Sequence, residues 1–94
     1  MARLSDAEIE ERLASSEWKR EGDQIVRYAD CGGFMAAMDL ANAVADAANA
    51  ANHHPNILVH DYNHLRLELS THSEGGITEN DFALAETIDG LPTG

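Results

Sequence analysis

Cysteine is nearly absent from this 94-residue chain. Cys31 is the single cysteine, so a disulfide within the chain is excluded and we expect a reducing compartment, the cytoplasm. The chain also lacks any apolar run that approaches the roughly 20 residues of a membrane-spanning helix. Residues 1–14 lack the apolar core of a signal peptide. We therefore expect neither export nor attachment to a membrane.

Basic residues are also few. Six lysines and arginines stand against seventeen aspartates and glutamates, which gives a formal charge of −11. This charge repels phosphate backbones and anionic lipids, so direct binding of nucleic acids or membranes is not expected. Aromatic residues make up only 5% of the chain, and the core must therefore consist mainly of leucine, isoleucine, valine and alanine. We expect one domain over residues 1–94, with a small core that gains stability from oligomerisation.

The amino-terminal half predicts a helix, a hairpin and a longer helix. Ser5 and Glu8 form a capping-box pattern, which starts a helix. A turn around Gly22 separates two β-favouring segments, and this arrangement is typical of a hairpin. Alanine-rich sequence follows, with bulkier apolar residues near a 3.6-residue period. The predicted elements are a helix over Asp6–Ala14, strands over Trp18–Arg20 and Gln24–Tyr28, and a helix over Gly33–Asn52.

The carboxyl-terminal half predicts two strands and a last helix. Ile57–Val59 is a short apolar run, and Leu65–Leu69 alternates leucine with polar residues, as in strands with one buried face. Thr78, with Asp81 three residues later, predicts the start of a helix that ends before Gly90. The order is α-β-β-α-β-β-α. We therefore expect an α+β fold, with a four-stranded antiparallel sheet and the helices packed on one face.

Histidines are concentrated in the second half of the chain. His53 and His54 end the long predicted helix, and His72 ends the last predicted strand. If the helix packs on the sheet, two or three of these imidazoles can surround one cleft and exchange protons near neutral pH. Spacing alone leaves two alternatives, bonding of free helix carbonyls and a zinc site, although no H-x-x-x-H helical pair or paired cysteines support zinc. His60 and His64 are expected to be solvated residues of a turn.

The chain resembles the pterin-4a-carbinolamine dehydratases over nearly its whole length. A histidine pair before proline, joined by one hairpin to Ser-Thr-His, is a specific combination. The matching motifs, in the family's order, are His53-His54-Pro55, Tyr62-Asn63, Leu69-Ser70-Thr71-His72 and Gly75-Gly76-Ile77-Thr78-Glu79-Asn80-Asp81. The predicted order of helices and strands also matches the fold of that family.

The resemblance implies an enzyme, a hydro-lyase that converts 4a-hydroxytetrahydropterin into quinonoid dihydropterin and water during tetrahydropterin recycling. The pterin is the substrate, and no cofactor or metal is implied. A homodimer or homotetramer is implied, and an aromatic amino acid hydroxylase is the implied partner enzyme. The alternative is a non-catalytic protein-interaction or dimerisation module, because the family reuses the same fold in that way.

The resemblance also implies roles for single residues. His53 and His72 correspond to the acid–base pair, and His54 corresponds to a residue that orients or stabilises the leaving hydroxyl. The resemblance does not decide which histidine of the pair is the acid. Asp81 matches the family's aspartate near the site, and helix capping is its alternative role.

Further positions are implied as pterin contacts. They are Pro55, Ser70, Thr71 and Tyr62. The alternative for Ser70 is simple strand-end geometry, and the alternative for Tyr62 is packing in the core or an interface. The chain departs from the family at Asn49, where many members have an acidic residue. Asp46 lies on roughly the same helix face, with a solvated surface charge as its alternative role.

Overall fold

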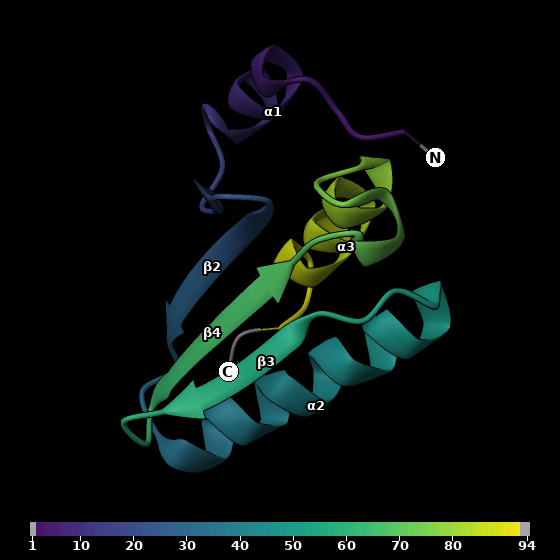
Figure 1. The fold of residues 1–94 in the computed structure, drawn as a ribbon. Helices are drawn as coiled ribbons and strands as arrows, with labels where there is room; N and C mark the ends of the chain where they lie inside the picture. Colours follow the sequence, from purple (N-terminus) through teal and green to yellow (C-terminus); the bar gives the residue numbers. More distant parts are fainter. Residues whose placement is uncertain (1, 93–94) are drawn as a thin grey trace.

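The computed structural model describes residues 2–92, which form three α-helices, four strands and one 3₁₀ helix (Figure 1). The α-helices are α1 (Asp6–Leu13), α2 (Phe34–Ala51) and α3 (Glu79–Asp89), and the 3₁₀ helix is η1 (His72–Glu74). The strands are β1 (Lys19–Glu21), β2 (Gln24–Asp30), β3 (Asn56–His60) and β4 (His64–Leu69). The predicted α+β class and element order are confirmed. No helix within the described residues is long and apolar enough to cross a membrane.

The strands form one sheet in the order β1-β2-β4-β3, and every neighbouring pair is antiparallel. β4 is central, between β2 and β3. Asn56, the first residue of β3, pairs with Glu68 near the end of β4. The segment before β3 and the segment after β4 therefore leave the sheet at the same end. This topology brings residues 53–55 close to residues 70–72.

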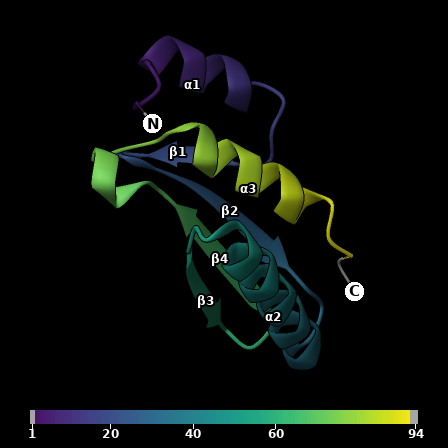
Figure 2. The same cartoon turned by 90° about the vertical axis from the view of Figure 1, so that its right-hand side faces the viewer.

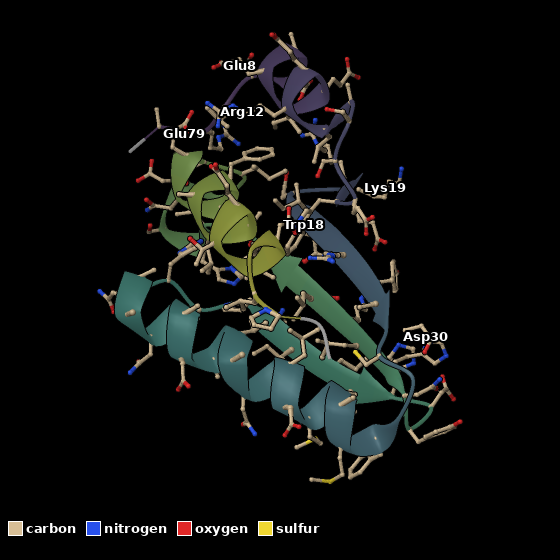
Figure 3. The ribbon with its side chains drawn as sticks, turned by 180° about the vertical axis from the view of Figure 1, so that it is seen from behind. Glu8, Arg12, Trp18, Lys19, Asp30 and Glu79 are labelled. Atoms are coloured by element: carbon tan, nitrogen blue, oxygen red, sulfur yellow. The ribbon has the colours of Figure 1, made fainter. Side chains whose placement is uncertain are left out.

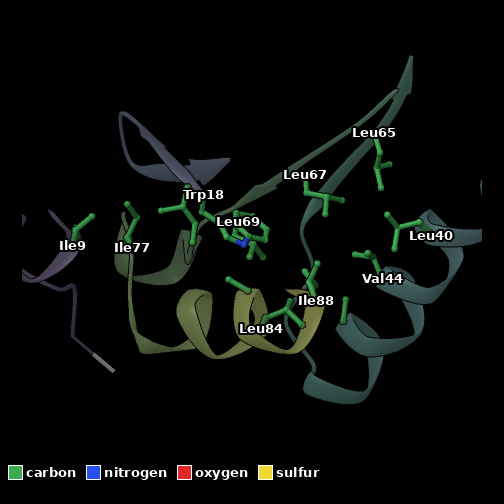
Figure 4. Packing of buried hydrophobic residues seen from close by; sticks show 13 residues of the cluster. Ile9, Trp18, Leu40, Val44, Leu65, Leu67, Leu69, Ile77, Leu84 and Ile88 are labelled. Atoms are coloured by element: carbon green, nitrogen blue, oxygen red, sulfur yellow. The ribbon is translucent and has the colours of Figure 1, made fainter. Parts of the chain in front are cut away.

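The core lies between the sheet and two helices that cover one of its faces. Figures 1 and 2 show α2 and α3 on the same side of the sheet. Leu65, Leu67 and Leu69 of β4 are almost fully buried and belong to one cluster with residues from both helices (Figure 4). Trp18 lies in this cluster and donates its indole N–H to Asp89 at 2.9 Å. The alternation of leucines predicted from the sequence thus faces the helices.

α1 lies beside the start of α3, at one end of the molecule (Figures 2 and 3). Its start carries the predicted capping box, in which the Ser5 hydroxyl accepts the Glu8 N–H and the Glu8 carboxylate accepts the Ser5 N–H. Ile9 is the buried residue of this helix. The guanidinium of Arg12 pairs with the carboxylate of Glu79 in the first turn of α3. α1 is thereby attached to the segment that positions the candidate site.

The end of β4 differs from the sequence prediction. We expected His72 to end the last strand, but β4 ends at Leu69 and His72 opens η1. The physical reason is a tight return of the chain. Thr71 forms an isolated bridge with Gly76, and Gly75 takes a left-handed conformation with φ 71° that closes the turn between them.

The residues around the β3–β4 turn also differ from the prediction. His60 and His64 are not free turn residues, because they are the last residue of β3 and the first of β4 and pair with each other. Their rings stack with centroids 5.4 Å apart. The turn itself is formed by Asp61 and Tyr62, both with positive φ, together with Asn63.

Candidate active site

The end of α2 determines the direction in which the histidine pair leaves the helix. Asn52 takes a left-handed conformation with φ 51°, a conformation that asparagine tolerates better than most residues. Its N–H and the N–H of His53 both bond to carbonyls of the last helical turn, including that of Ala48. The helix therefore ends sharply, and the His53 side chain reaches the first turn of α3.

His53 and Asp81 form a close, largely buried pair. The His53 Nε2 atom lies 2.6 Å from the Asp81 Oδ1 atom. The side chain of Asp81 is fully buried and that of His53 is 14% exposed. A buried carboxylate is stable only when donors surround it, and the amino-terminal turn of α3 also favours negative charge at this place. Asp81 thus contacts the candidate histidine and also caps α3.

Two threonines supply the other hydrogen bonds of Asp81. Its Oδ2 atom accepts the Thr78 N–H at 2.8 Å and the Thr71 hydroxyl at 2.9 Å. The two threonine hydroxyl oxygens lie 2.8 Å apart. Both side chains are buried. The Thr71 hydroxyl, which the resemblance implied as a pterin contact, is therefore hydrogen-bonded within the protein.

Ser70 and His72 flank Thr71 in the chain and line one surface hollow. His72 is exposed and Ser70 is half-buried. The hollow has a volume of about 310 Å³ and is also lined by Glu21 and Gln24 of the β1–β2 hairpin. His72 is connected to His53 indirectly, because its neighbour Thr71 bonds to the carboxylate that holds the His53 ring.

His54 and Pro55 line a second hollow, of about 360 Å³, against the last turns of α2. Asn49 and Asp46 line the same hollow, so the position at which the chain departs from the family shares this hollow with His54. Within residues 2–92, His54 and His72 thus line different hollows. We expected two or three of the imidazoles around one cleft, and within the described residues of one chain His54 and His72 do not share one.

Tyr62 lies far from the other candidate residues. It occupies the β3–β4 turn, whereas His53 and Thr71 lie at the opposite end of these strands (Figure 1). A five-residue strand separates the two ends by roughly 17 Å. The Tyr62 side chain is 66% exposed. Within one chain, Tyr62 therefore does not join the cluster, and its role as a pterin contact stays a prediction.

Thr78 is the one residue of the cluster that sequence analysis identified only as a helix cap. Its bond to the Thr71 hydroxyl depends on the loop through η1, which returns the chain over seven residues. The available signal was the capping box, because a Thr-x-x-Asp cap places hydroxyl and carboxylate side by side. Among residues 2–92, no group of three or more histidines, cysteines and acidic residues is arranged to hold a metal ion.

The comparisons with known proteins agree on one family. The family model described as pterin 4 alpha carbinolamine dehydratase matches residues 2–91. A relative from Chloroflexus aurantiacus that bears this dehydratase name is 50% identical over 90 residues, covering 95% of this chain and 96% of its own. A relative of the same name from Acidobacterium capsulatum is 47% identical over 92 residues, covering 97% and 99%.

A solved structure extends the agreement to the fold. The crystal structure of a transcriptional coactivator/pterin dehydratase from Brucella melitensis matches with a TM-score of 0.85 and 30% identity, covering 93% of this chain and 95% of its own. The chain belongs to the pterin 4 alpha carbinolamine dehydratase family, whose members are hydro-lyases. The resemblance inferred from the histidine motifs is thereby confirmed.

Proposed function

We propose that this chain dehydrates 4a-hydroxytetrahydropterin to quinonoid dihydropterin and water, as a step of tetrahydropterin recycling. The observation that carries the proposal is the largely buried His53–Asp81 pair, which Thr71 connects to the loop that bears His72. The family and the dehydratase names of relatives with 50% and 47% identity support the substrate class.

The reaction needs one acid and one base. The bond between C4a and the hydroxyl oxygen breaks, the bond between N5 and its proton breaks, and the two fragments leave as water without oxidation or reduction. Positioned acid–base groups typically accelerate such steps by about 100- to 10,000-fold. His53 suits the base, because the Asp81 carboxylate orients its ring and stabilises the imidazolium that forms.

The exposed histidines complete the proposal. We assign His72 as the acid that protonates the leaving hydroxyl, since it lies on the loop next to Thr71 and is open to solvent. His54 shares a hollow with Asn49, and we assign it to orient the hydroxyl or the water that leaves. We assign Ser70, in the hollow of His72, and Pro55, in the hollow of His54, as pterin contacts, which requires a substrate that reaches from one hollow to the other. The chemistry requires no cofactor.

The direct test is stopped-flow measurement of the decay of freshly generated 4a-hydroxytetrahydropterin. We expect wild-type protein to accelerate the decay, and His53→Ala and His72→Ala each to lower the rate constant by about 100-fold or more. His64→Ala is the matched control, because His64 lies at the other end of β4, and it should retain the full rate. Clean wild-type protein without any acceleration would contradict the proposal.

A second candidate function is protein association. The Brucella melitensis structure is called a transcriptional coactivator as well as a pterin dehydratase. In this chain, Phe34 and Met35 at the start of α2 are 51% and 67% exposed, which is typical of an association surface. We infer that α2 contributes to a homodimer or homotetramer. Sedimentation velocity should show the wild-type oligomer dissociating in a Phe34→Ser/Met35→Ser double variant and persisting in His53→Ala.

A further inference from the structure

We propose that Thr71 and Thr78 are positioning residues that hold His53 as the tautomer protonated at Nε2, which leaves Nδ1 as the atom that takes the proton from the substrate. This inference rests on the proposed function and deepens it. It assigns Thr71 to the support of His53 instead of direct pterin contact. It is carried by the directions of the hydrogen bonds that Thr71 and Thr78 make with Asp81 and by the charge favoured at the start of α3.

The directions follow from counting hydrogens. Thr71 has one hydroxyl hydrogen, and it points to Asp81 Oδ2 at 2.9 Å. The 2.8 Å contact between the two hydroxyls must therefore use the hydrogen of Thr78, with Thr71 as the acceptor. The Thr78 oxygen in turn accepts the N–H of Asn80 at 3.2 Å. Each hydroxyl thus donates once and accepts once.

A protonated Asp81 that donates to Thr71 would leave a buried hydroxyl without an acceptor. If Asp81 were protonated and donated to Thr71, the Thr71 hydrogen would point to Thr78. The Thr78 hydroxyl hydrogen would then have no acceptor among the described residues, in a side chain that is fully buried. A buried donor without a partner is unfavourable, and the N-terminal turn of α3 favours the charged carboxylate. The threonines therefore exclude a proton on Oδ2, and the charge favoured at the amino-terminal turn of α3 makes Oδ1 an acceptor as well.

This result determines the proton on His53. The Oδ1 atom of Asp81 can only accept, so the His53 nitrogen 2.6 Å away must carry a hydrogen. In the neutral imidazole the other nitrogen, Nδ1, then carries the lone pair. Among residues 2–92, Nδ1 has no hydrogen-bond partner, and the ring is 14% exposed. Nδ1 is thus the free basic atom of the site.

The first test needs no substrate. Protein labelled with ¹⁵N-histidine is examined by long-range ¹H–¹⁵N NMR at alkaline pH, where the imidazole is neutral, and the His53 signals are assigned by their loss in His53→Gln. We expect His53 to show a protonated Nε2 and an unprotonated Nδ1. A protonated Nδ1 would overturn the inference, whether or not the protein has dehydratase activity.

Asp81→Asn provides a sharper version of the same test. The Thr78 N–H and the Thr71 hydroxyl both donate to the inner oxygen, so the amide oxygen of the new side chain must occupy that place. Its NH₂ group must then face His53 and donate to Nε2. We expect the NMR pattern to invert to the tautomer protonated at Nδ1, with a rate constant lowered by about 100-fold or more. An unchanged tautomer in a folded variant would contradict the role of the threonines.

Thr71→Val and Thr71→Ser separate positioning from substrate contact. Valine removes the hydroxyl at nearly constant volume, whereas serine keeps it. If Thr71 acts through Asp81, kcat falls about tenfold in Thr71→Val, KM is unchanged, and Thr71→Ser restores kcat. A raised KM with unchanged kcat would instead make Thr71 a pterin contact and refute the positioning role. If the wild-type protein and both variants were inactive, the NMR experiment would still determine the tautomer of His53.

Discussion

Asp81 accepts hydrogen bonds from groups of three separate segments of the chain. His53 follows α2, Thr71 follows β4, and the Thr78 N–H precedes α3. The carboxylate is fully buried, so water cannot replace any of these partners. At the scale of residues, the candidate site and the stability of this corner of the fold therefore depend on the same side chain.

Asp81→Ala is expected to destabilise the protein strongly. The change leaves the His53 ring nitrogen, the Thr71 hydroxyl and the Thr78 N–H without their acceptor, and it removes half of the α3 capping box. We expect a loss of about 3 kcal/mol or more in the free energy of unfolding, measured by urea denaturation. Asp46→Ala, an exposed change on α2, is the control and should cost about 0.5 kcal/mol or less. Equal stability of the two variants would contradict this account.

The sequence predicted only part of this site. The capping pattern of Thr78 and Asp81 is local, so three residues of spacing were sufficient to predict it. The contact between Asp81 and His53 spans 28 positions and depends on how α2 and α3 end and begin. The resemblance to a family assigned both His53 and Asp81 to the site, whereas their spacing in the sequence could not predict that they meet. Tyr62 shows that a matching motif is not sufficient, because this residue belongs to a family motif and yet lies in the β3–β4 turn, away from the cluster.

At the scale of elements, the helices agree with the prediction to within one residue at their starts. Capping residues explain this agreement for α1 and α3, because Ser5 and Thr78 satisfy free N–H groups at positions that are visible in the sequence. The end of β4 was predicted less well. The alternation of leucines continues to Leu69, and nothing in that periodicity signals that Thr71 pairs with Gly76 across a 3₁₀ turn.

The capping box of α1 makes the stability of this helix dependent on pH. The Ser5 N–H, and then the Ser5 hydroxyl, donate to the Glu8 carboxylate and lower the pKa of Glu8. Because the pKa is lower in the folded protein, the stabilisation is complete above the ordinary glutamate value of about 4.3 and is lost as the pH falls through the folded value. Glu8→Gln should remove this pH dependence.

The pKa of Glu8 can be followed directly by NMR titration of its carboxyl carbon. We expect Ser5→Ala to raise the midpoint part of the way towards the ordinary value, because the backbone N–H remains while the hydroxyl is lost. Ser15→Ala, an exposed change just beyond α1, should leave the midpoint unchanged. The same Glu8 midpoint in Ser5→Ala and wild type would show that the hydroxyl does not contribute.

At the scale of the whole molecule, one core holds the sheet and the helices together. The inward face of β4 and the apolar faces of α2 and α3 belong to a single buried cluster (Figure 4). Its few aromatic residues are compensated by leucine, isoleucine and alanine, as the composition predicted. Among the fully buried side chains of residues 2–92, Trp18 is the aromatic one.

Two neighbouring leucines test this description of the core. Leu67 on β4 is 2% exposed, whereas Leu58 on the adjacent strand β3 is 52% exposed. We expect Leu67→Ala to lower the free energy of unfolding by about 2–5 kcal/mol through lost burial and a residual cavity. Leu58→Ala should cost about 0.5 kcal/mol or less in the monomer. Urea denaturation of both variants measures the difference, and comparable losses would refute the assignment of the buried face.

Charge is the second property of the whole molecule, and it is unbalanced. Four arginines pair with carboxylates in the structure: Arg12 with Glu79, Arg20 with Asp6, Arg27 with Asp89 and Arg66 with Glu21. With seventeen acidic and six basic residues, carboxylates outnumber basic side chains almost three to one. Repulsion among the carboxylates should therefore exceed the attraction within these ion pairs, which lie largely at the surface and contribute little each.

This imbalance determines the sign of the response to salt. Raising the NaCl concentration from about 0.01 M to about 0.15 M shortens the Debye length from about 30 Å to about 8 Å, so the repulsion is screened. We expect Tm to rise over this range, measured by circular dichroism. Glu10→Lys removes a negative charge from the exposed side of α1 and should raise Tm at low salt while reducing the salt effect. A fall in Tm with salt would mean that the arginine pairs, and not the excess carboxylates, dominate the electrostatic energy.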